Sequence, residues 1–165
     1  MNLSVGQNWM LSRLFSPEAM VLSLGAQDRD GVLKELVDRI PDLTKMPHAR
    51  SALFEALLER EKLSSTALGN GVALPHTRNT IANLAGRTMV VFGRHPQGVL
   101  YGAPDRCPVQ LCFLLLAPTV SQHLQALSRL SRLLRQSELR QNLLAAETAD
   151  EVMTSVREAE EKVWG

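Results

Sequence analysis

One histidine in this chain lies among residues that suit a phosphoryl group. His76 follows a proline, and arginines lie near both ends of its stretch, at Arg60 and Arg78. A neutral imidazole is a good nucleophile near neutral pH, and guanidinium and hydroxyl groups stabilise phosphoryl oxygens. The stretch therefore indicates that His76 accepts a phosphate and passes it on. The hydroxyl residues that could hold this phosphate are Ser65, Thr66 and Thr77.

Arg60 and His123 could also belong to this site. For each of them the spacing also fits a purely structural role. Arg60 follows Leu57 on a predicted helix, so it either complements the dipole at the helix C-terminus or reaches over the rim to an anion. His123 precedes Leu127 and lies in the first turn after Ser121. It either packs beside an apolar stripe or joins an anion site at a helix N-terminus. Spacing alone does not decide between these interpretations.

The remaining histidines and the glycine-rich segment indicate no further chemistry. His48 and His95 lie near helix-start and turn residues, and we expect both at the surface. The segment Gly69-Asn70-Gly71 tolerates positive φ and predicts a hinge. It lacks the Lys-Ser/Thr of a P-loop and the spacing of a dinucleotide-binding loop, so it gives little support to nucleotide binding. We therefore expect no cofactor.

The two cysteines, Cys107 and Cys112, predict reduced thiols. Both belong to one short stretch that is extended at Cys112, and an extended chain keeps two such residues too far apart for a disulfide. A zinc site needs more ligands than the histidines and cysteines offer here. We therefore expect no metal and a cytoplasmic protein.

Composition and charge bound the class of protein. The chain has 165 residues, of which 45% are hydrophobic and 21% charged, and its formal net charge is +1. This length predicts a single domain, 1–165, and the balanced charge argues against nucleic-acid binding. Residues 1–15 lack the sustained apolar core of a secretion signal. The longest apolar run, 111–118, is too short to cross a bilayer, so we expect no membrane insertion.

Hydrophobic periodicity predicts alternating helices and strands, and hence an α/β fold. The expected helices are 28–40, 47–61, 121–135, 138–145 and 149–163. The expected strands are 88–92 and 109–116, the second of them central in the sheet. Residues 72–74 are expected to be extended and 96–108 to be rich in turns. Near the N-terminus a helix start at 16–18 competes with a short strand at 20–24.

Two of the predicted helices carry site residues, and their apolar stripes set their orientation. In 47–61 the inner face consists of Leu53, Leu57, Phe54 and Leu58. In 121–135 we expect Ser121 to be the N-cap. The inward side chains of that helix are expected to be Leu124, Leu127, Leu130 and Leu134. This arrangement would place Arg60 at the end of one helix and His123 at the beginning of the other.

Residues 60–78 resemble the signature of the enzyme IIA proteins of the phosphotransferase system, in the mannitol/fructose and nitrogen-regulatory group. That pattern is a charged helix end, a Ser/Thr, Gly-x-Gly and then Ala-apolar-Pro-His. It appears here as Glu61, Thr66, Gly69-Asn70-Gly71 and Ala73-Leu74-Pro75-His76. A second block, 108–118 followed by His123, Leu124 and Leu127, is similar to the family's central strand and following helix. The resemblance covers about residues 11–163.

The resemblance implies a single-domain fold with a mixed β-sheet flanked by helices on both faces, and a phosphocarrier function. It implies that His76 takes a phosphoryl group from a histidine phosphocarrier protein, that His123 lies beside it and that Arg60 lines the site. With no permease segment in the chain, we favour the nitrogen-regulatory, PtsN-like branch, in which the phosphorylation state acts in regulation. Two alternatives stay open: a sugar-specific enzyme IIA that relays phosphate to an enzyme IIB partner, and a regulatory binding module without transfer.

Two positions depart from the family pattern. Most members have a small residue, usually glycine, after the active histidine, whereas this chain has Thr77. Its β-branched side chain excludes positive φ in practice, so we expect a local change in the loop or in partner docking. At the N-terminal helix the usual lysine before the apolar stripe is replaced by Arg29-Asp30.

Overall fold

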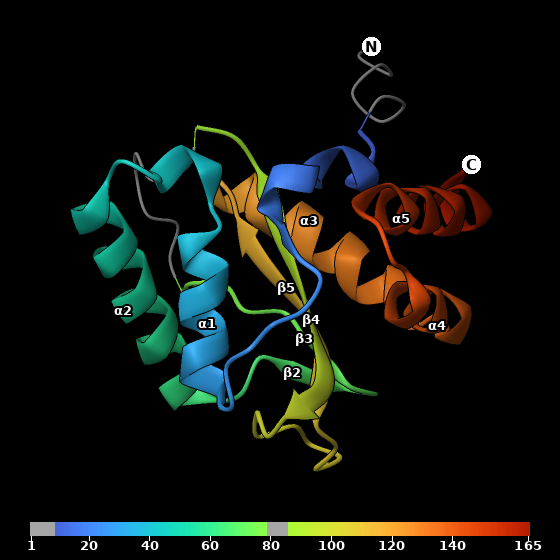
Figure 1. The fold of residues 1–165 in the computed structure, drawn as a ribbon. Helices are drawn as coiled ribbons and strands as arrows, with labels where there is room; N and C mark the ends of the chain where they lie inside the picture. The colour runs from blue at the N-terminus through green and yellow to red at the C-terminus, as the bar shows by residue number, and fades with distance from the viewer. Residues whose placement is uncertain (1–8, 79–85) are drawn as a thin grey trace.

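A five-stranded mixed β-sheet forms the centre of the fold, in the order β1-β4-β5-β3-β2 (Figure 1). The strands are β1 (Met20–Val21), β2 (Ala67–Gly69), β3 (Val72–Ala73), β4 (Met89–Val99) and β5 (Val109–Leu116). The pairs β1/β4 and β3/β5 are parallel, and the pairs β4/β5 and β2/β3 are antiparallel. The prediction that 109–116 forms the central strand is confirmed.

The computed structural model describes residues 9–78 and 86–165. Residues 1–8, which belong to the segment where we expect no secretion signal, lie outside the described residues.

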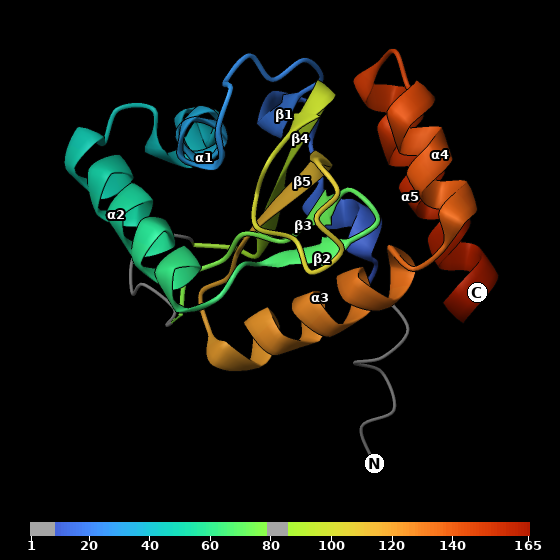
Figure 2. The same cartoon turned by 90° about the horizontal axis from the view of Figure 1, so that it is seen from below.

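Helices cover both faces of this sheet (Figure 2). On one face lie α1 (Arg29–Asp38) and α2 (Pro47–Leu63), and on the other α3 (Val120–Leu133), α4 (Ser137–Ala145) and α5 (Ala149–Trp164). Short 3-10 helices occupy Leu11–Leu14, Pro17–Ala19 and Pro41–Leu43. The expected α/β class, with a mixed sheet flanked by helices on both faces, is confirmed.

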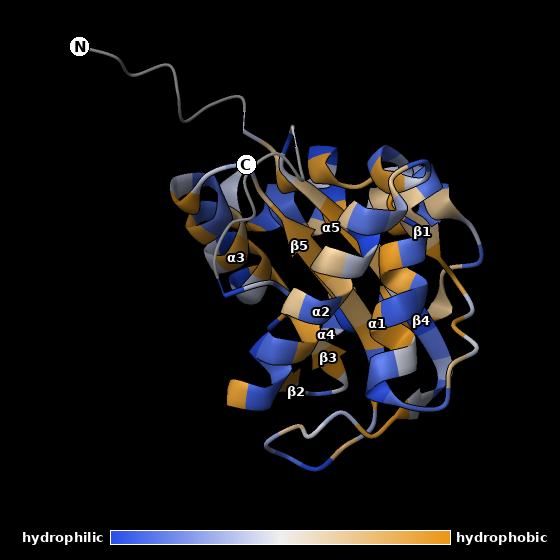
Figure 3. Ribbon diagram, turned by 90° about the vertical axis from the view of Figure 1, so that its left-hand side faces the viewer, coloured by the Kyte–Doolittle hydropathy of each residue, from blue (hydrophilic) through white to orange (hydrophobic). Residues whose placement is uncertain are grey.

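Alternation along the two long strands creates two hydrophobic cores. On β5, Leu111, Phe113 and Leu115 pack toward α3, α4 and α5, while Cys112 and Leu114 pack toward α1 and α2. All five side chains are buried. In Figure 3 the strand β5 is coloured as hydrophobic, whereas α1 and α2 carry both hydrophobic and hydrophilic segments. A strand buried on both faces accounts for the continuous apolar run in its sequence.

The helices begin and end within a few residues of the predicted bounds, and the competing N-terminal alternatives are both realised in short form. The Oδ1 atom of Asp28 accepts a hydrogen bond from the N–H of Gly31 at 2.7 Å and caps α1. Between Ser16 and Leu24 the chain makes a 3-10 turn and then the two-residue strand β1. Strand β1 is brief because it pairs with β4 only at Met20 and Val21.

The predicted start and inner face of the helix after β5 are partly wrong. Its N-cap is Thr119, whose Oγ1 accepts a hydrogen bond from the N–H of Gln122 at 3.2 Å, and not Ser121. The buried stripe is Ala126, Leu130 and Leu133, with Leu134 just beyond the helix. Leu124 is 57% exposed because it lies about 120° around the helix from Leu130.

Two predictions about 88–108 also need correction. Strand β4 continues to Val99, with a register shift relative to β5 between Arg94 and Val99. Pro96 lies within this irregular part, where the regular hydrogen bonds of the strand pair are interrupted and a proline, which has no N–H, is tolerated. His95 is buried and not at the surface, whereas His48 is exposed as expected. The Nε2 atom of His95 lies 2.8 Å from the carbonyl of Ala26, and its Nδ1 accepts from the N–H of Gly98 at 2.9 Å.

The segment Gly69-Asn70-Gly71 is the tight turn between β2 and β3, and the predicted tolerance of positive φ is confirmed at all three residues. Its residues have φ of 96°, 56° and 77°, the left-handed region that favours glycine and asparagine. The N–H of Asn70 donates to Asp105 at 2.8 Å, and the carbonyl of Gly71 accepts from two residues at the start of β5. The turn fixes how β3 enters the sheet, and therefore where the next residues leave it.

Candidate functional site

His76 lies on the segment that leaves the sheet after β3, and main-chain hydrogen bonds anchor the residues before it. In Figure 2 this segment runs outward from the sheet between α2 and α3. The N–H of Leu74 donates to the carbonyl of Thr66 at 3.0 Å, and the N–H of Leu115 donates to the carbonyl of Pro75 at 3.0 Å. The backbone that carries His76 is therefore tied to both the hairpin and the central strand.

The imidazole of His76 is oriented by one main-chain group. Its Nδ1 atom lies 2.7 Å from the carbonyl oxygen of Leu74. A carbonyl can only accept a hydrogen bond, so Nδ1 carries the proton in the neutral ring. This tautomer leaves the lone pair on Nε2, and Nε2 is the atom able to act as a nucleophile.

His123 lies beside His76, as the family resemblance implied. The centroids of the two imidazoles are 5.2 Å apart and their planes are inclined by 53°. His123 is half-buried in the first turn of α3, where its N–H donates to the carbonyl of Thr119 at 3.0 Å. The N-terminal end of α3 therefore brings a second imidazole to the proposed nucleophile.

Arg60 lies in the last turn of α2, at the edge of the same site. Its guanidinium donates from Nη1 to the carbonyl of Ser64 at 2.8 Å, which caps the end of the helix. Its positive charge also lowers the pKa of His76, so the guanidinium lies within electrostatic range of that ring. Both roles weighed from the sequence, a charge at the helix C-terminus and a member of the site, are compatible with this position.

The environment favours the neutral form of both imidazoles, because it lowers the pKa of each. Burial is the largest cause that lowers the pKa of His76, and the positive charge of Arg60 lowers it further. The hydrogen bond to Leu74 and the charge of Glu61 act in the opposite direction. Burial also lowers the pKa of His123, and His76 adds to that effect. A neutral imidazole retains the lone pair that a nucleophile requires.

A buried carboxylate beneath this site was missed by the sequence analysis as a site residue. Glu61, only 4% exposed, accepts hydrogen bonds from the N–H of Thr66 at 3.0 Å, from the Thr66 hydroxyl, and from the Tyr101 hydroxyl at 2.9 Å. Its spacing from Leu53 and Leu57 on α2 is the signal that could have revealed it, because all three fall on the inner stripe of the helix.

The hydroxyl residues proposed to bind phosphate take up different positions. Thr66 is buried and donates to Glu61, and Ser65 donates from Oγ to the carbonyl of Tyr101 at 3.0 Å. Thr77 follows His76 directly and is 9% exposed. Among the non-glycine residues of 9–78 and 86–165, positive φ occurs only at Asn70 and Arg106, so Thr77 is not forced into the left-handed region.

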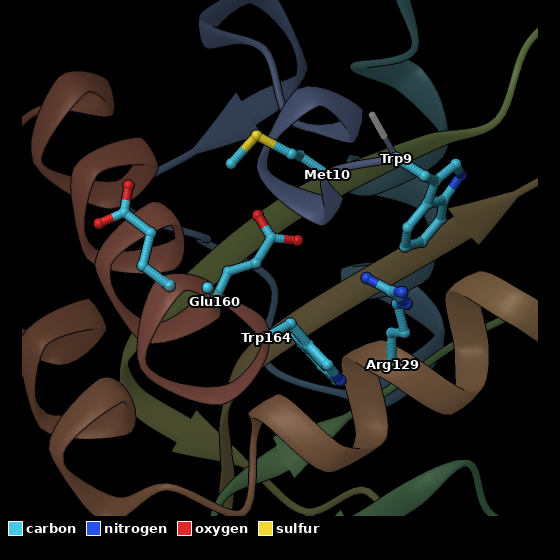
Figure 4. A pocket seen from close by; sticks show the side chains of 7 residues that line it. Trp9, Met10, Arg129, Glu160 and Trp164 are labelled. Carbon is cyan, nitrogen blue, oxygen red and sulfur yellow. The ribbon is translucent and has the colours of Figure 1, made fainter. Parts of the chain in front are cut away.

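A separate pocket of about 320 Å³ lies between the N-terminal segment, the end of α5 and Arg129 of α3, and neither His76 nor His123 lines it (Figure 4). The guanidinium of Arg129 lies between the rings of Trp9 and Trp164, 4.8 Å from each ring centroid. Glu160 in its wall is buried and accepts a hydrogen bond from the N–H of Leu11. These contacts join the N-terminal segment, α3 and α5.

The described residues show neither a metal-binding cluster nor a membrane-spanning helix. Within 9–78 and 86–165, no group of three or more His, Cys, Asp or Glu side chains is arranged to hold a metal ion. In the same part of the chain, no helix is long and apolar enough to cross a membrane.

On this mixed α/β sheet, the imidazole of His76 therefore lies beside that of His123 and within electrostatic range of Arg60. The family model for EIIA 2 of the phosphoenolpyruvate-dependent sugar phosphotransferase system matches residues 13–159. The chain belongs to this family, whose members are phosphotransfer components, and the resemblance found in residues 60–78 is confirmed.

Relatives from both branches of the family are similar to this chain. A nitrogen regulatory protein of Bradyrhizobium diazoefficiens is 36% identical over 144 residues, covering 86% of this chain and 91% of that protein. A fructose-specific EIIABC component of Bacillus subtilis is 34% identical over 151 residues, covering 90% of this chain but only 23% of that protein. The crystal structure of IIA-Ntr from Neisseria meningitidis aligns with a TM-score of 0.78 at 30% identity, covering 88% of this chain and 98% of that one.

Proposed function

We propose that His76 accepts a phosphoryl group from a histidine phosphocarrier protein of the phosphotransferase system, and that its phosphorylation state serves nitrogen-related regulation. One observation carries the proposal: the ring of His76 is held by the Leu74 carbonyl through Nδ1, next to His123 and within range of Arg60. This arrangement combines a directed lone pair with groups that stabilise phosphoryl oxygens.

The transfer is a single in-line displacement. The lone pair on Nε2 of His76 attacks the phosphorus of the donor's phosphohistidine, a bond from Nε2 to phosphorus forms, and the donor's nitrogen–phosphorus bond breaks with its electron pair returning to the donor ring. Such transfers depend mainly on positioning and on charge stabilisation. Arg60 and His123 are the groups we assign to the equatorial oxygens. Nδ1 keeps its proton throughout.

The hydroxyl groups have a secondary role in this scheme. The hydroxyls of Ser65 and Thr66 already donate inside the protein, so each would have to rotate before it could reach a phosphate. Thr77 is adjacent to His76 in the chain and stays a candidate phosphate contact.

A protein partner fits the surroundings of the site. Val120 and Leu124 flank His123 on α3 and are 61% and 57% exposed, and Leu63 at the end of α2 is 61% exposed. Exposed apolar side chains beside a functional residue are typical of a surface that another protein covers. We propose that the phosphocarrier docks here, and that an enzyme IIB or a regulatory target uses the same surface.

Regulation is the first choice because the similar nitrogen regulatory protein matches this chain over nearly its whole length. The sugar-transport alternative, in which His76 passes the phosphate to an enzyme IIB partner, is supported by the fructose-specific relative, of which this chain spans only a part. A third alternative is a module that binds a target without transferring phosphate. It rests on Thr77, which stands where most family members have a small residue after the active histidine.

Phosphorylation with a purified donor tests the proposal. The protein is incubated with a phosphorylated histidine phosphocarrier, and acid-labile phosphate is mapped by mass spectrometry on wild type and on His76→Asn, with His48→Asn as a matched control on an exposed histidine. We expect label on His76 in wild type and in the control, and none in His76→Asn. Label on another residue would refute the assignment.

A second experiment separates regulation from sugar transport. The phosphorylated and unphosphorylated forms are each used to capture partners, and each captured protein is tested as a phosphate acceptor. Regulation predicts a partner that binds one form preferentially and takes up no phosphate. Sugar transport predicts a partner that becomes phosphorylated as His76 loses its phosphate.

A further inference from the structure

The carboxylate of Glu61 is buried, and the described residues give it no cationic partner. No ion pair within the described part of the chain includes it, and its oxygens receive their hydrogen bonds from Thr66 and Tyr101. A buried carboxylate costs free energy unless hydrogen bonds offset that cost. An apolar side chain would fill the same space without that cost. The cost is accounted for if this carboxylate has a function in the neighbouring site.

A continuous series of hydrogen bonds joins Glu61 to the ring of His76. The carboxylate accepts from the N–H of Thr66 at 3.0 Å. The carbonyl of Thr66 accepts from the N–H of Leu74 at 3.0 Å. The carbonyl of Leu74 receives the Nδ1 proton of His76 at 2.7 Å. Thr66 and Leu74 lie at the open end of the β2–β3 hairpin, so the carboxylate is linked to one side of the backbone that carries the orienting carbonyl, and the bond between Leu115 and Pro75 holds the other side.

Tyr101 supports the same carboxylate from the other side. Its hydroxyl donates to Glu61 at 2.9 Å, and its main-chain carbonyl accepts from Ser65 at 3.0 Å. Burial raises the pKa of Tyr101, and the charge of Glu61 adds to this, so the phenol remains a neutral donor. The charge of Glu61 also raises the pKa of His76, against the effect of Arg60.

We propose that Glu61 is a positioning residue for the transfer. It holds Thr66, and through Thr66 the Leu74 carbonyl, at the point where that carbonyl takes the Nδ1 proton of His76. The nucleophilic lone pair then stays on Nε2. Without this support the ring would also populate the tautomer protonated on Nε2, which has no lone pair on Nε2 for the attack. The inference depends on the proposed function for its role in catalysis, but not for the geometry it predicts.

The variant Glu61→Gln tests this proposal, because it keeps the shape of the side chain and removes its charge. In ¹⁵N NMR of the unphosphorylated protein we expect a smaller fraction of the Nδ1-protonated tautomer and a lower pKa for His76. The rate of phosphoryl acceptance should fall by about tenfold to a hundredfold, as for a modest loss of positioning. The matched control is Glu59→Gln on the same helix, where the exposed Glu59 pairs with Lys62.

Two further variants keep the test decisive. Tyr101→Phe removes one donor to Glu61 and leaves the charge, so it should weaken the tautomer preference less than Glu61→Gln does. Glu61→Asp keeps the charge and should restore part of the preference. A folded Glu61→Gln protein with an unchanged His76 tautomer would overturn the proposal, and if that variant does not fold, an unchanged tautomer in Tyr101→Phe would do so.

The NMR measurements also separate this proposal from the proposed function. If wild-type His76 takes up no phosphate, the phosphocarrier assignment for this chain fails. The tautomer and pKa of His76 in the Glu61 variants still show whether Glu61 orients the ring.

Discussion

The ring of His76 is oriented by the peptide carbonyl of Leu74 and not by a neighbouring carboxylate. A neutral acceptor fixes the tautomer without placing a full negative charge against the ring. Burial and the charge of Arg60 then keep the pKa of His76 below its ordinary value. The orientation of the ring and the lowering of its pKa therefore come mainly from different groups.

Replacement of Arg60 by glutamine should affect transfer more than folding. We expect the rate of phosphoryl acceptance to fall about a hundredfold, as when one donor to a developing oxyanion is removed. The free energy of unfolding should fall by only about 1 kcal/mol, because one hydrogen bond to Ser64 is lost. Transfer rates and urea unfolding check the two values. The exposed Lys62→Gln on the same helix is the control, and a protein unfolded by Arg60→Gln would favour a purely structural role.

At the scale of elements, the site is assembled from the ends of helices α2 and α3 and the segment after β3. Each end is fixed by its own local bond: Arg60 to the Ser64 carbonyl in α2, and Thr119 to the Gln122 N–H in α3. The tight turn at Gly69-Asn70-Gly71 sets the direction in which β3 delivers His76. A mutation that disturbs any of these three elements should change the rate of phosphoryl transfer to His76.

The cap of α3 provides a test of this assembly. We expect Thr119→Ala to lower the free energy of unfolding by about 1 kcal/mol, because the first turn loses its side-chain cap. It should also slow transfer, since His123 lies in that turn. Ser121→Ala, at the position that sequence patterning favoured for the cap, should change neither. Thermal unfolding and transfer rates measure both variants, and equal effects of the two would contradict this account.

The elements that could be predicted from sequence are those with an uninterrupted periodic pattern. Strand 109–116 is an almost unbroken apolar run, and the helix over 28–40 has Val32, Leu36 and Val37 at helical spacing. In the helix over 47–61 the buried apolar residues are confined to Leu53 and Leu57. Strand β4 was predicted too short because Pro96 and Gly98 suggest turns, and only pairing with β5 across a bulge shows that the strand continues. The cap at Thr119 was missed because Ser121 is an equally good capping residue in sequence terms.

The residues of the candidate site were easier to predict than the buried polar residues that hold them in place. Arg60, His76 and His123 could be named because each matches a family motif, and the structure brings His76 and His123 together. The burial of Glu61 could have been predicted from its place on the stripe of Leu53 and Leu57, but its partner Tyr101 could not. Tyr101 and His95 could not be recognised as buried polar groups, because their hydrogen-bond partners are main-chain or distant groups that periodicity does not specify. The same limit applies to Thr66, whose hydroxyl faces Glu61.

At the scale of the whole molecule, the two ends of the described chain are joined on one side of the sheet. Glu160 on α5 accepts from the N–H groups of Leu11 and Ser12, and Arg129 of α3 lies between Trp9 and Trp164. These contacts lie at the edge of the hydrophobic core between the sheet and helices α3, α4 and α5. They lie away from His76, so they should contribute to stability and not to transfer.

Loss of the Glu160 carboxylate should therefore destabilise the fold. We expect Glu160→Ala to lower the free energy of unfolding by about 2–3 kcal/mol, because buried main-chain donors lose a charged acceptor. Glu161→Ala, at the exposed neighbouring position, should have little effect. Urea unfolding measures both, and comparable losses in the two variants would argue against the role assigned to Glu160.

The two site histidines should make stability dependent on pH. Burial lowers the pKa of His76 and His123 in the folded protein below the ordinary value of 6.5. As the pH falls through 6.5 the unfolded chain binds protons first, so the free energy of unfolding decreases toward acid and is fully retained above that pH. Urea unfolding between pH 5 and pH 8 should show a smaller decrease in His123→Asn. An equal or larger decrease in that variant would contradict the prediction.

The central claim concerns one atom, the Nε2 of His76, and NMR of the phosphorylated protein tests it most directly. Protein labelled with ¹⁵N in its histidines is phosphorylated by a histidine phosphocarrier, and the ring nitrogens of His76 are assigned. We predict that phosphorus is bonded to Nε2 while Nδ1 keeps its proton and its hydrogen bond to Leu74. Phosphorus on Nδ1, or on any residue other than His76, would contradict the account.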